Sequence, residues 1–370
     1  MQNIARIARA SCVIASLFAI TPRAAAAPDE LCQPPAPFAA RDIGAMRAPL
    51  SRVRDYRPVF QQCRNPAFQS RLAIRRMRID GAGFLLTVDP ETLATHVEPE
   101  QCWTCADTSE EAQKGTRFVR AVQTYAQPAA GSTAPHTPYL RNAGLIHGEG
   151  EGAYITGDLC PSPRPLDRDF LERLAQLGPR TPVALSISGV WLTHHGEDFQ
   201  WLKEQARSGA LEITWVNHSF HHPYFVGQPL DNNFLLSPGV DLQGEVLDTE
   251  KLLIANGETP SIFFRFPGLI SNPALMEMLR ADHLVPLGAD GWMVFAPPLR
   301  PGAIILVHPN GNEPAGLRLF SKRLDASTLP RPFRSLNDAP LKGAPDSGQT
   351  SGACPADPGC PRQSEATRRN

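Results

Sequence analysis

The sequence predicts an α/β fold in which alternating strands and helices surround a parallel sheet or barrel. From about residue 146 to residue 320, short apolar runs alternate with segments whose apolar residues recur at helical spacing. Ionisable residues directly follow many of these runs. The carboxyl ends of parallel strands are where α/β folds build their sites, so we expect a functional site on the face that these ends share.

The predicted strands are short apolar runs between turn signals. They cover residues 153–156, 183–187, 211–216, 262–264, 284–287 and 303–307. Helices are expected between them at about 166–177, 198–208 and 243–256, each with a glycine placed to end it. Another helix should begin at Asn272, because Asn suits the N-cap and Pro273 the first turn.

The first residues have the three parts of a secretory signal. Arg6 and Arg9 precede the apolar run 10–20, and small residues follow at 24–26. We therefore expect a signal peptide over residues 1–26, and a mature protein that is secreted or periplasmic. The apolar run is short for a bilayer span, and no later run is long enough for a transmembrane helix.

Three further segments follow the predicted signal peptide. Residues 27–145 mix Pro-rich connections with a few ordered elements, such as a hairpin at Asp80-Gly81, and are predicted to form an accessory N-terminal region. The predicted catalytic domain covers residues 146–325. The remainder, 326–370, is rich in Pro, Gly, Ser and charge, which predicts a disordered tail.

The composition supports a folded domain and gives no reason to expect a nucleic-acid partner. A hydrophobic content of 42% in 370 residues allows a full core. The formal net charge of −1 provides no general attraction to nucleic acid or to an anionic membrane.

The cysteines suggest disulfides in an exported protein. Loss of Cys12 with the signal peptide leaves seven of the eight, so at least one should be free or paired between chains. Cys32 with Cys63 and Cys354 with Cys360 are plausible pairs. Cys102 and Cys105 have the spacing of a redox or zinc pair, but without a second such pair a local disulfide is the better interpretation.

The segment Asn217–Pro223, directly after the third predicted strand, is the strongest candidate for a metal site. His218 and His222 are four residues apart, so one helical turn would place both imidazoles on the same side. Neutral imidazoles are good ligands for zinc or a similar divalent ion, but a catalytic site needs a third ligand and an open position. His221 would then lie to one side.

Other strand ends also supply ionisable groups. They are Asp158, Arg265, Asp290 with Trp292 nearby, and His308. Each could be structural on its own. Because parallel strand ends converge on one face of a barrel, their joint presence favours one shared site.

These residues form an ordered set that resembles the NodB-homology polysaccharide deacetylases. The resemblance covers about residues 155–309 and depends on the series Thr156-Gly157-Asp158-Leu159-Cys160-Pro161, His218-Ser219-Phe220-His221-His222, Arg265-Phe266-Pro267-Gly268, Asp290-Gly291-Trp292 and Leu306-Val307-His308-Pro309. It implies a distorted (β/α) barrel and metal-dependent hydrolysis of acetyl groups on sugars.

The resemblance also implies roles for individual residues. His218 and His222 would be metal ligands, with Zn²⁺ the expected ion. Arg265 would orient the catalytic carboxylate. Asp290 would tune a histidine, and His308 would be the general acid.

The first motif departs from the family pattern of two adjacent carboxylates, a base and a metal ligand. Here Asp158 occupies the base position and Leu159 the ligand position. Asp158 could rotate to complete a two-His, one-carboxylate site, which is the arrangement we favour, since an anionic oxygen tightens binding. Alternatively, it could remain a base, or the site could have lost its chemistry. A divergent branch of the family, with a single Asp followed by a small or apolar residue and then Cys, looks similar to Thr156-Gly157-Asp158-Leu159-Cys160.

The sequence therefore predicts an exported, metal-dependent carbohydrate deacetylase acting on N- or O-acetyl groups of an acetylated polysaccharide or oligosaccharide. The alternative is a catalytically inactive, deacetylase-like protein that binds carbohydrate or organises the cell envelope. Four aromatic residues near the turns could stack on sugar rings or serve as ordinary packing: Trp191, Tyr224, Phe266 and Trp292.

Overall fold

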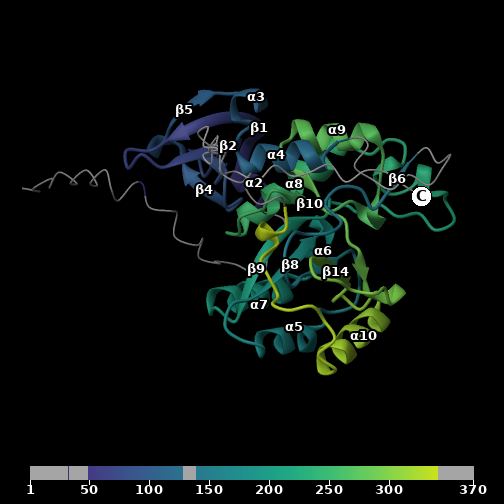
Figure 1. Cartoon of the computed structure of the whole chain (residues 1–370). Coiled ribbons are helices and arrows are strands. Elements are labelled where there is room, and N and C mark those ends of the chain that lie inside the picture. Colours follow the sequence, from purple (N-terminus) through teal and green to yellow (C-terminus); the bar gives the residue numbers. More distant parts are fainter. Residues whose placement is uncertain (1–31, 33–48, 128–138, 341–370) are drawn as a thin grey trace, which may run out of the picture.

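The computed structural model describes residue 32 and residues 49–127 and 139–340. The predicted signal peptide lies outside the described residues. Figure 1 shows two main bodies of secondary structure, an N-terminal sheet in purple and blue and a larger α/β unit in teal, green and yellow. Among the helices that are described, none combines the length and the apolar character needed to span a bilayer.

The α/β unit contains a seven-stranded sheet that curls into an open, distorted (β/α) barrel, as the sequence predicted. All of its strand pairs are parallel. In spatial order the strands are β12 (Val285–Pro286), β10 (Phe263–Phe264), β9 (Leu211–Asn217), β8 (Thr181–Ile187), β7 (Ala153–Leu159), β14 (Ala303–Val307) and β13 (Gly291–Trp292). The sequence predicted six of them; β13 was missed because Gly291-Trp292 does not lie in a longer apolar run of the kind that surrounds the equally short β10 and β12.

Helices connect the strands and cover one face of the sheet. They are α5 (Arg168–Ala175), α6 (Gly189–His194), α7 (Gly196–Arg207), α8 (Leu242–Ala255), α9 (Pro273–Ala281) and α10 (Pro314–Asp325). The predicted start of α9 is confirmed, because the Asn272 side chain accepts a hydrogen bond from the Leu275 N–H at 2.8 Å. The sequence did not predict α6 or α10.

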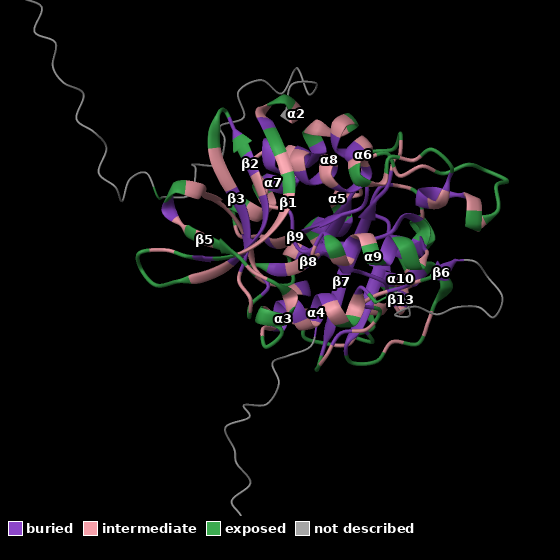
Figure 2. Cartoon of the chain, turned by 90° about the horizontal axis from the view of Figure 1, so that it is seen from above, coloured by how far each residue is buried: buried purple, intermediate pink, exposed green. Residues whose placement is uncertain are grey.

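The two faces of the parallel sheet contribute to different cores. On β7, Ile155 packs with the apolar residues of α5, α7 and α10, whereas its neighbour Tyr154 packs with residues of the N-terminal region. This alternation is the two-residue period of a strand that is buried on both faces. Figure 2 shows the strands of this sheet almost entirely buried. The N-terminal region therefore shares a core with the barrel.

The N-terminal region is built on a five-stranded antiparallel sheet in the order β4-β3-β2-β1-β5. The predicted hairpin at Asp80-Gly81 is confirmed, since Ile79 pairs with Ala82 and both turn residues have positive φ. The elements of this region are α2 (Pro49–Arg52), β1 (Val53–Arg64), β2 (Ser70–Ile79), β3 (Ala82–Val88), β4 (Thr95–Pro99), β5 (Thr104–Asp107), α3 (Glu110–Gln113) and α4 (Arg117–Tyr125). Further along, β6 (Leu140–Arg141) pairs antiparallel with β11 (Ile270–Ser271) of the α/β unit.

A buried ion pair joins this sheet to the barrel. The Arg75 guanidinium on β2 donates to both carboxylate oxygens of Glu250 on α8, at 2.8 and 3.1 Å. It also donates to the backbone carbonyl of Asp282 at 2.7 Å, and the Tyr56 hydroxyl donates to Glu250 at 2.7 Å. Both charged side chains are buried, so removing one would leave the other without its main counter-charge.

Order continues beyond the predicted end of the domain. Phe333 pairs with Ala153 in a parallel bridge, and Leu336 is buried in the core shared by the two regions. The Arg117 guanidinium donates to the backbone carbonyl of Pro340 at 2.9 Å. The prediction that the disordered tail starts at residue 326 is therefore wrong. The prediction relied on the polar composition of the segment, but two apolar residues, Phe333 and Leu336, are enough to anchor it. Residues 341–370 lie outside the described residues.

The disulfide predictions that can be compared are also wrong. Cys32 pairs with Cys102, and Cys63 pairs with Cys105. Cys63 on β1 lies opposite Cys105 on β5 in the antiparallel register. The pairing of these two strands therefore brings Cys105, rather than the predicted Cys32, next to Cys63. Cys160 is free, in line with the expected unpaired thiol. Cys354 and Cys360 lie outside the described residues.

His283 makes the junction between the sheet and the barrel sensitive to acid. Its ring stacks on Phe60 of β1 with centroids 4.0 Å apart. Burial and the charge of Arg75 lower its pKa to about 4, despite an opposing effect of Glu110. The unfolded state therefore binds the proton more tightly, and stability that is complete above about pH 6.5 is lost as pH falls towards 4.

We expect this loss to reach about 3 kcal/mol in the free energy of unfolding. The variant His283→Asn tolerates the positive φ of 57° at this position and should have a flatter dependence between pH 6.5 and pH 4. Urea unfolding of both proteins at several pH values would measure the difference. Parallel curves would contradict the assignment.

Candidate functional site

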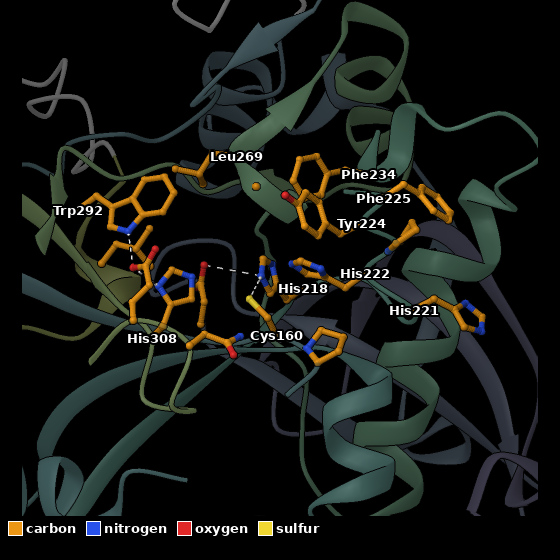
Figure 3. Close-up of a pocket in the computed structure, with 17 residues that line it drawn as sticks. Cys160, His218, His221, His222, Tyr224, Phe225, Phe234, Leu269, Trp292 and His308 are labelled. Carbon is orange, nitrogen blue, oxygen red and sulfur yellow. Dashed lines mark hydrogen bonds and ion pairs between the residues drawn. The ribbon is translucent and has the colours of Figure 1, made fainter. Parts of the chain in front are cut away.

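A pocket of about 950 Å³ opens at the carboxyl ends of the barrel strands. Four of the predicted site residues line it: Asp158, His218, His222 and His308. Figure 3 shows His218, His222 and Cys160 in its centre, with Trp292 and His308 on one side and Tyr224 and Phe225 on the other. Arg265 is fully buried next to the pocket, and Asp290 does not line it.

The turn after β9 brings His218 and His222 together without forming a helix. Ser219 and His222 have left-handed backbone conformations, with φ of 65° and 49°. The prediction of a helical turn is therefore wrong, but its consequence is correct, because the two imidazole centroids are 4.7 Å apart. Such conformations are costly for residues other than glycine and persist only where the surroundings stabilise them.

Glu245 provides that stabilisation from the first turn of α8. Its Oε2 accepts hydrogen bonds from the N–H groups of Phe220 and His221 at 3.0 and 2.9 Å, and from His222 at 3.4 Å. Its Oε1 lies 2.7 Å from Nδ1 of His221. The carboxylate is buried. His221 is thus held to the side by Glu245, and its ring is exposed.

The orientation of His218 is fixed by the backbone. Its Nδ1 lies 2.8 Å from the carbonyl oxygen of Arg265, so Nδ1 donates a proton, and in the neutral ring Nε2 carries the lone pair. Nε2 lies 3.4 Å from Sγ of Cys160 and 3.7 Å from Oδ2 of Asp158. A histidine that is anchored through one nitrogen in this way is typical of metal ligands.

Cys160 is a site residue that the sequence interpretation missed. Its sulfur and one nitrogen each of His218 and His222 all lie within 4.8 Å of one another. Successive side chains on a strand point to opposite sides, so Asp158 and Cys160 share the pocket side at the end of β7, while Leu159 is buried in the core on the helix side. The leucine that seemed to occupy a ligand position therefore does not face the site.

Asp158 forms an ion pair with Arg265. The guanidinium donates to Oδ1 of Asp158 at 2.9 Å and to the Thr156 hydroxyl at 2.8 Å, and the backbone carbonyl of Gly288 accepts from it at 2.9 Å. Burial raises the pKa of the Asp158 carboxyl, but the charges of Arg265, His218 and His308 together with a hydrogen bond from Ser186 outweigh this effect, so the pKa lies below its ordinary value. Asp158 is therefore an ionised carboxylate in a largely buried position at neutral pH.

His308 also lines the pocket and pairs with a carboxylate. Its Nδ1 lies 2.8 Å from Oε2 of Glu313, which also accepts a hydrogen bond from the Trp292 indole at 2.9 Å. Burial lowers the pKa of His308, but contacts with Cys160 and Glu313 outweigh burial and raise it well above 6.5. His308 can therefore hold a proton at neutral pH, as a general acid must.

Asp290 pairs with a histidine, but that histidine is His147. The two side chains are 2.6 Å apart, and the other Asp290 oxygen accepts the N–H of Ile304 at 2.9 Å. Neither contact reaches the pocket. The carboxylate beside His308 is instead Glu313, which the sequence interpretation did not select. Glu313 directly precedes Pro314, the first residue of α10, and its contact with His308 depends on how that helix packs.

The four aromatic candidates separate into two groups. Trp191 and Phe266 are buried in the cores, so they cannot contact a sugar. Tyr224 and Trp292 line the pocket. Tyr224 is 58% exposed and stacks on Phe234, which leaves one face of its ring available.

The pocket residues fit a divalent transition metal. Nε2 of His222 is buried and lacks a hydrogen-bond partner among the described residues, which is costly for a polar atom unless something else satisfies it. His218 presents a second lone pair beside it. Two imidazoles with an anionic group nearby form a donor set that suits zinc and similar ions.

No protein-family model matches the chain, but the structure is similar to several solved proteins. A family 4 carbohydrate esterase from Bacillus anthracis aligns at 16% identity with a TM-score of 0.39, over 54% of this chain and 87% of that one. One from Bacillus subtilis aligns at 15% identity with a TM-score of 0.39, over 70% and 94%.

A CE4 family pseudoenzyme from Bacillus anthracis is also similar, at 17% identity with a TM-score of 0.32, over 50% of this chain and 66% of that one. With TM-scores below 0.5, these similarities do not decide a function. These solved proteins are of the carbohydrate esterase family, the NodB-type polysaccharide deacetylases, that the sequence motifs of this chain resemble.

Proposed function

We propose that this protein is an exported, metal-dependent deacetylase that hydrolyses N- or O-acetyl groups of a polysaccharide. The observation that carries the proposal is the joint placement of two kinds of group in one pocket. Lone pairs of His218 and His222 converge there, and an ionised Asp158 and a protonated His308 lie beside them. Export is proposed from the predicted signal peptide.

The reaction adds water to the acetyl carbonyl carbon and breaks the bond from that carbon to the sugar nitrogen or oxygen. The products are acetate and a free amine or hydroxyl. A bound divalent ion supplies Lewis acidity towards the carbonyl and the water. Asp158 accepts the proton of the attacking water, and Arg265 keeps that carboxylate ionised and aimed into the pocket.

His308 completes the proton balance. It gives its proton to the departing amine or alkoxide, which would otherwise leave as a poor, strongly basic group. Glu313 holds the ring in place and stabilises its charged form. Tyr224 and Trp292 are placed on opposite sides of the pocket to contact the sugar ring next to the acetyl group (Figure 3).

The alternative, an inactive deacetylase-like protein that binds carbohydrate, rested mainly on Leu159. That support is weaker now, because Leu159 lies in the core and Cys160 occupies the pocket side of the strand end. A binding protein also has no need of a buried arginine that holds a buried carboxylate ionised. We therefore place catalysis first.

Acetate release tests the proposal directly. Chitin oligomers, an acetylated exopolysaccharide and an aryl acetate would be assayed with and without chelator, and bound metal would be measured. We expect release from at least one carbohydrate, its loss with chelator, and a decrease of at least about 10²-fold in His222→Ala together with loss of metal.

The matched control is His194→Ala, which removes an exposed histidine of α6 outside the pocket. It should retain both metal and activity. Equal metal content and equal activity in wild type and His222→Ala would end the proposal. Metal binding without release from any acetylated substrate would favour the inactive alternative.

A further inference from the structure

We infer that Cys160, rather than Asp158, is the third protein ligand, so that a thiolate and two imidazoles hold the metal. This inference rests on the proposed metal site and changes its chemistry. The sequence resemblance implied a carboxylate in this role. The geometry assigns the ligand and base roles to two side chains that share one side of β7.

The distances around the sulfur suit a shared ion. For zinc with bonds of about 2.3 Å to sulfur and 2.0–2.1 Å to nitrogen, a tetrahedral angle separates the two donors by about 3.6 Å. Sγ of Cys160 lies 3.4 Å from Nε2 of His218. The His222 nitrogen completes a triangle with no side above 4.8 Å. Nε2 of His222 is buried and has no hydrogen-bond partner among the described residues, a deficit that a bound ion would remove.

Asp158 is already engaged by another group. Arg265 holds its Oδ1 at 2.9 Å, while its Oδ2 lies 3.7 Å from Nε2 of His218. Among the described residues, the set of three donor atoms that lie within 4.8 Å of one another is Cys160, His218 and His222, without a carboxylate. To join these donors Asp158 would have to move from this position, which would disturb the buried ion pair that it makes with Arg265. Cys160 needs no such rearrangement.

The ligand type has a consequence for metal choice. A thiolate is a soft ligand and selects zinc or cobalt over magnesium, calcium or manganese, which prefer oxygen. The thiolate also carries one negative charge, as a carboxylate ligand would. The net charge at the metal is therefore the same with either ligand. Asp158 then remains free to accept a proton.

Cobalt substitution tests the inference without relying on activity. The full-length protein would be loaded with Co²⁺ alone, and its absorption would be recorded in the visible and near-ultraviolet. We expect a thiolate-to-cobalt charge-transfer band in wild type and in Asp158→Asn. The band should be absent in Cys160→Ser, whose Co²⁺ affinity should fall at least tenfold.

Two further variants keep the outcome interpretable. Cys160→Asp should still bind Co²⁺ but lack the band, which guards against a serine variant that fails to fold. Cys354→Ser with Cys360→Ser removes the cysteines near the C-terminus, and the band should persist. The other four described cysteines are in disulfides.

Cobalt binding to wild type without the near-ultraviolet band would overturn the inference, and so would a band that survives in Cys160→Ser. The proposed function can fail separately. Wild type that shows the band but releases no acetate would retain the thiolate site and lose the deacetylase assignment. Metal-dependent acetate release without the band would support the deacetylase assignment and rule out the thiolate ligand.

Discussion

Replacing Asp158 by asparagine is expected to lower kcat for acetate release by about 10²- to 10⁴-fold, the usual contribution of a general base. The amide retains the shape and can still accept the Arg265 hydrogen bond, but it cannot take a proton from water. Metal content should stay close to that of wild type, because the structure does not place Asp158 among the converging donors. Steady-state kinetics and metal analysis would be done on the same preparations.

A matched control is Asp248→Asn on α8, a partly exposed carboxylate outside the pocket that pairs with Lys251. It should behave as wild type. Full activity in Asp158→Asn would show that this carboxylate is not the base. If metal and activity were lost in parallel, Asp158 would be a ligand, which is the arrangement that we favoured from the sequence.

Replacing Arg75 by methionine is expected to lower the free energy of unfolding by about 3–5 kcal/mol, the usual cost of leaving a buried charge without its partner. Glu250 would keep the Tyr56 hydroxyl but lose the guanidinium that binds both of its oxygens. Because the pair joins the N-terminal sheet to α8, the loss should affect both regions in one transition. Urea unfolding followed by circular dichroism would measure it.

Arg52→Met is the matched control, because Arg52 pairs with Asp80 at the surface. Exposed pairs contribute about 0–1 kcal/mol, so this variant should stay close to wild type. Adding Glu250→Gln to Arg75→Met removes the uncompensated charge and should recover much of the stability. If Arg75→Met lowered the free energy of unfolding no more than Arg52→Met does, the buried pair would not be important for stability.

The strands of the barrel could be predicted because their apolar runs and the turn signals around them are local. The same local reasoning failed where long-range packing decides the structure. Phe333 and Leu336 anchor a polar segment, and the pairing of Cys63 with Cys105 depends on the register of β1 and β5. Neither can be derived from spacing along the chain.

The candidate site was predictable where residues follow directly from strand ends. Asp158, His218, His222 and His308 line one pocket because parallel strands end on one face. Cys160 was missed because the motif was matched by position, whereas the side of a strand on which a residue lies alternates. Counting two residues on from Asp158 would have found it. Glu313 and Glu245 lie beside helix starts, and their partners are known only once the helices are packed.

The turn that presents His218 and His222 depends on a carboxylate outside the motif. Glu245 accepts hydrogen bonds from the backbone N–H groups of three consecutive residues of that turn. The spacing of the two histidines alone therefore does not specify the shape of the loop. Transplanting the His218–His222 segment into another barrel would therefore reproduce the donor atoms without their arrangement, unless an acidic residue were grafted onto the neighbouring helix at the same time.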